Sequence, residues 1–372
     1  MSQSNHHSFT PSRVEVKDLR KEFGAKVALN GVSLVVEPGT FTVLLGPSGS
    51  GKTTLLRCLA GIEQPTSGQI RIGDKVVFGP STVVSPDKRN LSMVFQDYAL
   101  WPHMSVRKNV AFPLSNTSLT RAEKQRRVAD LLERVGIAHL AERYPNELSG
   151  GEQQRVALAR ALSSQVGLVL FDEPLSNLDA DRRDQLRIEI ATLTRDAGVT
   201  AVYITHDQSE AFALADRVGV LRQGELVQYS RPEKVYRHPK SAFVARFTGV
   251  AGEFAVESVR PIADKRVEVT LPFAPFMTVE ATTSENSPYD VDPHLFVRAA
   301  GVSLHPETSD AGAPGVIRDV AYTGRGYEHV VDVGAPSSLT KVFAAERFER
   351  GDKVKVMFDP QSCFVMNAQE EA

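Results

Sequence analysis

The chain has 372 residues, of which 42% are hydrophobic and 24% charged, and its formal net charge is −2. This length predicts two or three domains with an ample core, and the near-neutral charge gives no electrostatic footprint for nucleic acid. The two cysteines exclude a disulfide framework and fit a reducing cytosol, and no run approaches the ~18 consecutive apolar residues of a membrane-spanning helix.

The first segments of the chain are strand-like and surround an aromatic residue. Residues 1–11 lack the apolar core of a signal peptide, and we expect a flexible tail there. Val14–Val16 and Val32–Val36 are typical of strands, and the loop between them contains KEFGAK. Phe23 in that loop is either a partly exposed anchor into the core or a ring that stacks on adenine.

Residues 41–53, FTVLLGPSGSGKT, carry the clearest chemical signal. An apolar strand is followed by Gly46–Thr53, which fits the phosphate-loop pattern G-x-x-x-x-G-K-[ST], and then by a helical pattern. The glycines let successive N–H groups point inward, toward the positive end of the helix that follows. Lys52 can reach the β- and γ-phosphates of a nucleotide, and the Thr53 hydroxyl can bind Mg²⁺.

An amide follows the next strand-like segment. Met93–Phe95 is apolar and ends at Gln96, and ligands bind at the carboxyl ends of strands in open α/β sheets. Residues 98–104 then form an aromatic-rich loop with Tyr98 and Trp101. This loop is either a packed surface loop or a contact surface for another protein, because exposed aromatic residues favour interfaces.

Residues 120–162 have a helical pattern, and Thr120 with Glu123 predicts a capping box at its start. Within this region LSGGEQQRVALARAL begins a helix at Ser149. The first N–H groups of such a helix can bind an anion, so the sequence predicts a second phosphate-seeking helix start, without a lysine.

Two buried strands end in ionisable residues. Val166–Phe171 is almost entirely apolar, as expected for the middle of a parallel sheet, and Asp172 and Glu173 follow it. Asp172 can hold Mg²⁺, and Glu173 can polarise a water molecule. Ala201–Thr205 ends in His206, which we expect at the same edge of the sheet.

The pattern changes after about residue 240. Alternating runs such as RVEVTL, GVIRDVAY, YEHVVDVG and KVKVMF are separated by Pro, Gly and Ser, which predicts a β-rich second domain. We find no catalytic constellation in this part of the sequence.

Together these motifs resemble an ABC transporter ATPase subunit of the bacterial importer type. GPSGSGKT is similar to the family's Walker A motif, LSGGEQQR to its signature, VLFDEP to Walker B, SNLD to the D-loop, ITHD to the H-loop and VFQD to the Q-loop. The resemblance implies an α/β P-loop NTPase core over residues 12–240, with a helical subdomain at about 97–160. Residues 241–372 resemble the β-rich, OB-like (TOBE-type) regulatory domain of such importers.

The resemblance also implies a site for ATP and Mg²⁺. Phe23 would stack on adenine, and the phosphates would lie against Gly46, Pro47, Ser48, Gly49, Ser50, Gly51, Lys52, Thr53 and Thr54. Mg²⁺ would be bound by Thr53, Gln96 and Asp172. Glu173 would be the general base and His206 would contact the γ-phosphate, so that the catalytic set is Lys52, Gln96, Glu173 and His206.

The family arrangement implies several partners. Ser149 and Gly151 would touch the γ-phosphate of ATP held by a second copy, and Asp179 would face that copy's P-loop. The expected assembly is a head-to-tail homodimer with two permease subunits, reached by an external solute-binding protein and peripheral to the cytoplasmic face of the cell membrane. We expect no nucleic-acid partner.

The transported solute is the least determined property. LLRCLAGIEQP, RYPNELSGGEQQR and VSLHP look most like ferric-iron uptake ATPases, while sulfate, polyamine, phosphonate or sugar uptake stays open. ABC-type ATPases that act on nucleic acid are a remote alternative. Those usually carry a long coiled coil between the motif halves, whereas Lys52 and Ser149 are 97 residues apart (149 minus 52).

Overall fold

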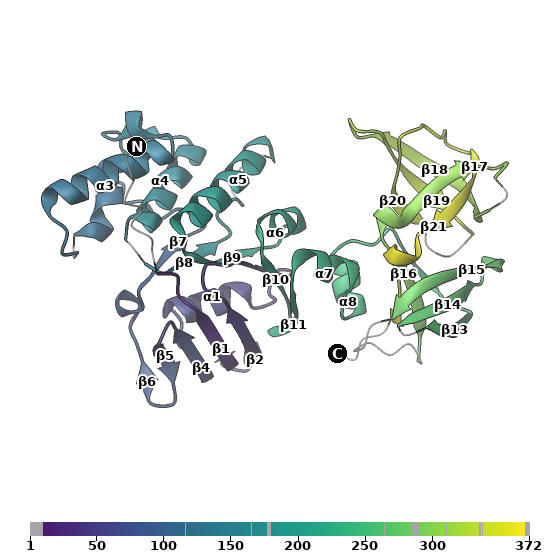
Figure 1. Cartoon of the computed structure of the whole chain (residues 1–372), viewed down its shortest axis with the longest axis horizontal. Helices are drawn as coiled ribbons and strands as arrows, with labels where there is room; N and C mark the ends of the chain where they lie inside the picture. Colours follow the sequence, from purple (N-terminus) through teal and green to yellow (C-terminus); the bar gives the residue numbers. More distant parts are fainter. Residues whose placement is uncertain are drawn as a thin grey trace, which may run out of the picture. The chain divides into compact units, whose positions relative to one another are not determined.

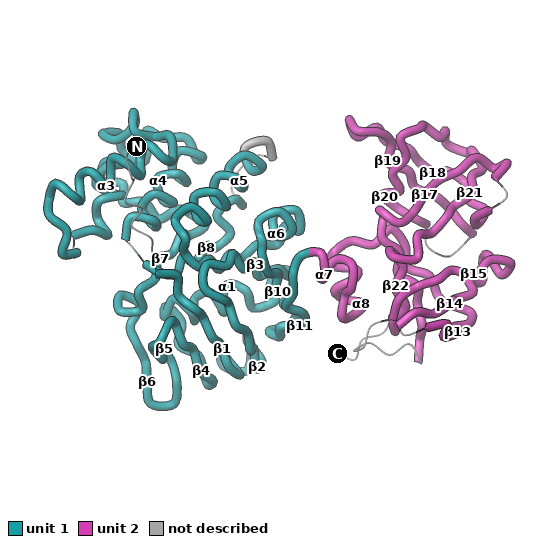
Figure 2. Tube along the Cα trace, in the orientation of Figure 1, with its two compact units in different colours: residues 1–232 teal, residues 233–372 magenta. Residues whose placement is uncertain are grey.

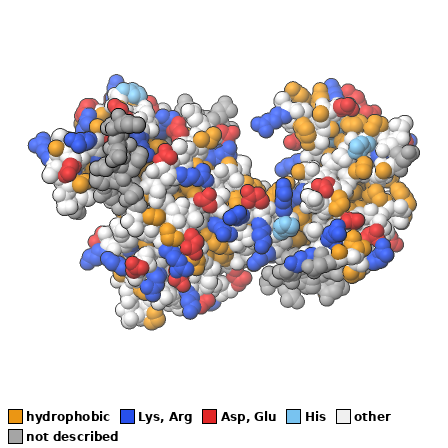
Figure 3. All heavy atoms as spheres, in the orientation of Figure 1, with side chains coloured by type: hydrophobic (Ala, Val, Ile, Leu, Met, Phe, Trp, Pro, Cys, Tyr) orange, Lys and Arg blue, Asp and Glu red, His pale blue; other side chains and the backbone are white. Residues whose placement is uncertain are grey.

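The computed structural model describes residues 10–115, 117–164, 166–176, 180–263, 265–283, 291–309, 311–334, 336 and 338–368, with only the backbone for 180–182. The chain divides into two compact units, Met1–Pro232 and Glu233–Ala372 (Figures 1 and 2). Among these residues, no helix has the length and apolar character needed to cross a bilayer. On the face drawn in Figure 3, acidic and basic side chains are interspersed, in keeping with the net charge of −2.

A six-stranded sheet forms the centre of the first unit, in the order β11-β10-β3-β9-β8-β7. All neighbours are parallel except the edge strand β11. Every residue of β3, β8 and β9 is buried, which explains why these strands are near-continuous apolar runs. The strands are β3 (Phe41–Leu45), β7 (Leu91–Val94), β8 (Leu168–Asp172), β9 (Thr200–Thr205), β10 (Arg217–Arg222) and β11 (Glu225–Ser230).

A second, antiparallel sheet has the order β2-β1-β4-β5-β6. Helix α1 (Lys52–Ala60) shares one hydrophobic core with both sheets, and Leu56 of α1, Val16 of β1 and Leu170 of β8 all belong to it. Packing in this shared core fixes the position of α1, which follows the phosphate loop, against both sheets. The strands are β1 (Val14–Phe23), β2 (Lys26–Val36), β4 (Ser67–Ile72), β5 (Lys75–Gly79) and β6 (Thr82–Val83).

The loop expected around KEFGAK is instead part of a long hairpin. β1 and β2 pair up to the turn, where Phe23 lies opposite Lys26, with register shifts along the way. The expectation of a loop was wrong because register shifts near Leu19 interrupt the apolar alternation without ending the strand.

Some helices of the first unit cover the central sheet. Others form a separate group in the segment of the chain between β7 and β8. The helices are α2 (Val106–Ala111), α3 (Arg121–Arg134), α4 (Gly150–Ser163), α5 (Ala180–Ala197) and α6 (Gln208–Leu214). α2, α3 and α4 contact one another within the region expected to be helical (Figure 1). The capping box of Thr120 and Glu123 is confirmed. The pattern over 120–162 is interrupted, however, because Gly136 (φ 70°) ends α3 and short 3₁₀ turns precede α4.

The second unit is β-rich, as the alternating runs predicted. Its sheets have the orders β12-β16-β22-β15-β14-β13 and β17-β21-β18-β19-β20 and contribute to one core. The strands are β12 (Gly252–Ala255), β13 (Ser258–Ala263), β14 (Arg266–Leu271), β15 (Ala274–Thr283), β16 (Pro293–Val297), β17 (Val302–Pro306), β18 (Ala313–Tyr322), β19 (Tyr327–Asp332), β20 (Leu339–Ala344), β21 (Lys353–Phe358) and β22 (Cys363–Asn367).

The division between the units falls at 232/233, eight residues before the boundary expected at 240/241 (240 minus 232). The buried guanidinium of Arg298 accounts for this difference. It donates to the carbonyl oxygens of Tyr236 (2.7 Å), at α7 (Pro232–Arg237), and Ala245 (2.9 Å), in α8 (Ala242–Phe247). These bonds attach the segment after residue 232 to the β-rich unit.

Candidate functional site

The phosphate loop lies between β3 and α1, and the side chain of Lys52 hydrogen-bonds to the backbone of the loop. Lys52 is 5% exposed, and its Nζ donates to the carbonyl oxygens of Gly46 (2.8 Å) and Pro47 (3.0 Å). Gly51 precedes the helix with φ 101°, a backbone conformation that glycine adopts readily. Burial lowers the pKa of Lys52, and the negative charge of Glu173 opposes that shift.

The strand β2 and the turn between β10 and β11 contact the backbone of this loop. A Cβ at Gly51 would lie 2.6 Å from the carbonyl oxygen of Ala28 in β2, so no side chain fits there. The backbone N–H of Gly224, in the turn between β10 and β11, donates to the carbonyl of Ser50 (3.0 Å). Neither contact is predictable from the sequence of the loop, because both come from segments distant in the chain.

A cavity of about 330 Å³ opens over the loop. Phe23 forms one wall and is 47% exposed, with Nζ of Lys21 4.4 Å from its ring centre. The lining residues are Phe23, Lys26, Ala28, Ser48, Gly49, Ser50, Gly51, Lys52, Thr53, Thr54 and Glu173. The structure therefore brings the expected adenine-stacking ring, phosphate loop and general base to one cavity. Lys26 and Ala28 were not foreseen, since the hairpin that carries them was expected to be a loop.

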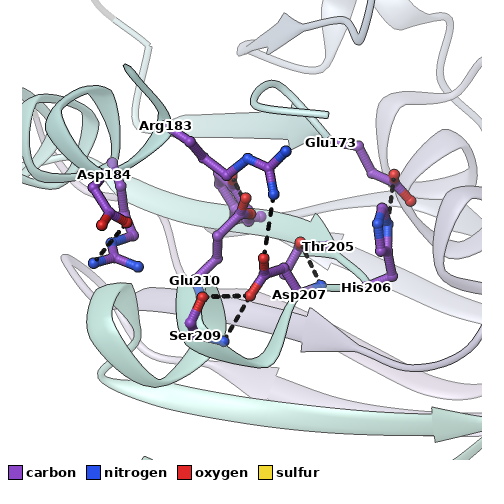
Figure 4. A network of polar contacts seen from close by, with 10 residues as sticks. Glu173, Arg183, Asp184, Thr205, His206, Asp207, Ser209 and Glu210 are labelled. Carbon is purple, nitrogen blue, oxygen red and sulfur yellow. Dashed lines mark hydrogen bonds and ion pairs between the residues drawn. The ribbon is translucent and has the colours of Figure 1, made fainter. Parts of the chain in front are cut away.

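Glu173 and His206 form a pair at the carboxyl ends of β8 and β9. Nδ1 of His206 lies 3.0 Å from Oε2 of Glu173 (Figure 4). Glu173 has φ 43°, which is uncommon for a residue other than glycine, and its N–H donates to the carbonyl of Ile204 (3.2 Å). The hydrogen bond to Ile204 anchors this backbone conformation to β9.

Asp172 and Gln96 are not among the described residues that line this cavity. Asp172 is 6% exposed, and burial raises its pKa while the charge of Arg57 in α1 opposes the shift. Gln96 follows β7 and is exposed. Both residues come from strand ends at the edge that carries Glu173, as expected from the parallel order of the sheet.

The second phosphate-seeking helix start is not part of this cavity. Ser149 and Gly151, at the start of α4, line a separate cavity with His139, Arg155 and Gln185. The carboxylate of Glu152 accepts hydrogen bonds from both the backbone N–H and the hydroxyl of Ser149, each at 2.7 Å. Asp179, predicted to face a second copy, lies outside the described residues.

The aromatic loop beside Gln96 is mostly packed against the chain. Tyr98 is only 5% exposed, and Arg160 of α4 donates to its carbonyl oxygen (2.7 Å). Trp101 packs against Phe112, with ring centres 4.3 Å apart, and lies beneath the Arg160 guanidinium. The interpretation as a packed surface loop therefore holds for Tyr98. Leu100 and Trp101 are half-buried, so part of each side chain is exposed.

Comparison with known proteins identifies two family matches. Residues 29–176 match the ABC transporter family and residues 295–366 match the TOBE domain family. The Fe(3+) ions import ATP-binding protein of Agrobacterium fabrum is 42% identical over 87% of this chain and 88% of its own length. The spermidine/putrescine import ATP-binding protein of Pseudomonas aeruginosa is 46% identical over 70% of this chain and 71% of its own. The sn-glycerol-3-phosphate import ATP-binding protein of Brucella abortus is 40% identical over 90% and 98%.

The chain is also similar to solved structures. A dimeric ATP-binding cassette in a post-hydrolysis state, bound to ADP and Pi, aligns with a TM-score of 0.52 and 30% identity. The alignment covers 59% of this chain and 98% of that one. The cbiO1 protein of Clostridium perfringens, part of the cbiONQ transporter complex, aligns with a TM-score of 0.54 and 28% identity over 60% and 89%.

Proposed function

Because the chain belongs to the ATP-binding, ATP-hydrolysing subunits of ABC importers, we propose that it powers ferric-iron uptake through partner permease subunits. The proposal of ATP hydrolysis rests on one observation: Lys52 and Glu173 line the same cavity, and His206 is hydrogen-bonded to Glu173. In phosphoryl transfer, a protein mainly positions groups and neutralises charge. Lys52 and the loop N–H groups bind the phosphates, and Glu173 accepts a proton from the attacking water.

Mg²⁺ is proposed as the metal partner of ATP. Within the part of the chain that the structure describes, no group of three or more His, Cys, Asp or Glu side chains is placed to hold a metal. This fits Mg²⁺, which commonly binds to one or two protein oxygens plus substrate phosphates. The Thr53 hydroxyl, the Asp172 carboxylate and the Gln96 amide are oxygen donors of the required kind. When bound, Mg²⁺ neutralises charge on the β- and γ-phosphates.

A second copy of the chain is proposed to complete each site. The start of α4 and the phosphate loop line separate cavities, so a single chain does not place Ser149 against its own nucleotide. In a head-to-tail homodimer, Ser149 and Gly151 of one copy contact the γ-phosphate held by Lys52 of the other. This symmetry explains why the second helix start needs no lysine.

The remaining partners are two transmembrane permease subunits and an external solute-binding protein reached through them. The chain lies at the cytoplasmic face of the cell membrane and binds it only through the permeases. We place the permease contact at residues 98–104, because this loop follows Gln96 directly and leaves Pro102 and His103 exposed. A displacement of residues 98–104 by the permeases would be transmitted through the backbone to Gln96 at the nucleotide site.

Ferric iron is proposed as the solute on the basis of the Agrobacterium fabrum relative, which is 42% identical over 87% of this chain. The test is uptake of labelled ferric iron, spermidine and glycerol-3-phosphate by a gene-deletion strain complemented with wild type or Lys52→Ala. We expect ferric-iron uptake to be lost and restored only by wild type. Loss of another solute alone would reassign the substrate, and unchanged uptake of all three would contradict the proposal for these solutes.

A further inference from the structure

Contacts around His206 extend to a second helix. Asp207 follows His206 and is the N-cap of α6, where its Oδ1 accepts from the backbone N–H groups of Ser209 (2.7 Å) and Glu210 (3.3 Å). Its other oxygen, Oδ2, lies 3.5 Å from Nη1 of Arg183 in α5. Figure 4 shows both this ion pair and the His206–Glu173 contact. One carboxylate therefore caps α6 and connects it to α5.

His206 lies between two anchored residues. Thr205 ends β9, is 3% exposed and pairs with Leu45 in the central sheet. The N–H of Asp207 donates to the Thr205 hydroxyl (2.9 Å). Only His206 separates the sheet from the α6 cap, so the position of Asp207 constrains the backbone from which the imidazole projects toward Glu173.

We propose that Arg183 is a positioning residue for ATP hydrolysis, because its ion pair with Asp207 holds His206 where the imidazole contacts Glu173. This inference rests on the proposed roles of Glu173 and His206. Arg183 is not among the described residues that line the nucleotide cavity, so it acts through the His206 segment.

The stability of each variant must be measured beside its activity. The Arg183 and Asp207 side chains are 32% and 26% exposed, and the charge of Arg183 also acts on Glu210 of α6, which is buried. A loss of activity without a loss of stability would therefore report on position. Displacing a catalytic group by about 1 Å can cost about 100-fold in rate.

The variants are chosen to remove the ion pair and leave the fold intact. Asp207→Asn keeps the N-cap, because Asn caps helices as well as Asp does, but removes the charge that faces Arg183. Arg183→Ala removes the other partner, and Arg183→Lys restores the charge. We expect Arg183→Ala and Asp207→Asn to lower kcat by about 10- to 100-fold. The KM for MgATP should stay within about twofold, and Arg183→Lys should recover part of kcat.

Arg195→Ala is the matched control. Arg195 is in the last turn of the same helix, where its Nη2 donates to the carbonyl oxygen of Leu214 (2.9 Å) and lies 3.7 Å from Asp216. The variant removes an α5–α6 contact at the end away from His206, and we expect wild-type kcat. An equal loss in Arg195→Ala and Arg183→Ala would overturn the inference, since it would indicate general helix packing.

The decisive measurement is ATPase activity of the full chain in a His206→Ala background. Because Arg183 acts through His206, Arg183→Ala should cause no further loss there, and a further loss of the same size would overturn the inference. If His206→Ala is slow but Arg183→Ala is as fast as wild type, this inference fails while the proposed function stands. If His206→Ala is itself as fast as wild type, the proposed role of His206 and this inference fail together, while ATP hydrolysis by the chain still stands. Should Arg183→Ala not fold, Asp207→Asn decides in the same way.

Discussion

Nδ1 of His206 lies 3.0 Å from Oε2 of Glu173, so the side chains that follow two neighbouring parallel strands, β9 and β8, meet in one hydrogen bond. The imidazole therefore fixes the direction of the carboxylate. Asp172 precedes Glu173 and interacts with the charge of Arg57 in α1, whereas Glu173 itself lines the nucleotide cavity. Adjacent carboxylates thus have different surroundings, which is the basis for assigning them different roles.

We expect Glu173→Gln to bind MgATP but to hydrolyse it about 10²- to 10⁴-fold more slowly, a barrier increase of roughly 2.7 to 5.5 kcal/mol. The amide keeps the size of the side chain but cannot accept the proton from water. The two copies should remain closed around ATP, which size-exclusion chromatography with MgATP would detect as a dimer. Lys52→Ala should instead bind nucleotide weakly and give no dimer. Near-wild-type hydrolysis by Glu173→Gln, without an ATP-stabilised dimer, would show that the base is another group.

We expect Gly51→Ala to destabilise the first unit and to weaken ATP binding. The added Cβ would lie 2.6 Å from the Ala28 carbonyl, in addition to the cost of φ 101°. Gly198→Ala is the control, since Gly198 has φ 67° but no atom within 4 Å of the added Cβ, and should cost only about 1–2 kcal/mol. Urea unfolding of both variants gives the comparison, and equal stability would contradict the steric argument.

We expect Arg298→Met to destabilise the second unit by about 3 kcal/mol or more, because several buried carbonyl groups lose their donor. Burial lowers the pKa of Arg298 to about 10, and the guanidinium remains charged at neutral pH. Arg318→Met, which removes an exposed ion pair with Asp332, should change stability by no more than about 1 kcal/mol. Denaturant unfolding followed by circular dichroism tests this, and similar values for the two variants would contradict the anchoring role.

We expect Leu100→Glu to prevent assembly with the permease subunits while leaving ATP binding unchanged. The substitution places a charge in the loop proposed to receive a permease helix, but leaves the packing of Trp101 on Phe112 in place. Val83→Glu in β6, at a position 60% exposed, is the control. Co-purification with the permeases measures assembly. Normal recovery of the Leu100→Glu complex would locate the permease contact elsewhere.

The sequence by itself determined the features that are encoded by adjacent residues. The phosphate loop was recognisable because eight consecutive residues, with a strand before and a helix after, have the required chemistry. The strand-end positions of Asp172, Glu173 and His206 followed from apolar runs that only a central parallel strand buries on both faces. The β-rich second unit followed in the same way from alternation in its strands.

Tertiary structure alone decided the features that depend on distant segments. Phe23 is held at the end of a hairpin, Gly224 supports the phosphate loop, and Arg298 assigns the segment after residue 232 to the second unit. Arg183 of α5 meets Asp207 at the start of α6. None of these pairs leaves a period or motif in the sequence, because each is set by how the packed layers place side chains far apart along the chain.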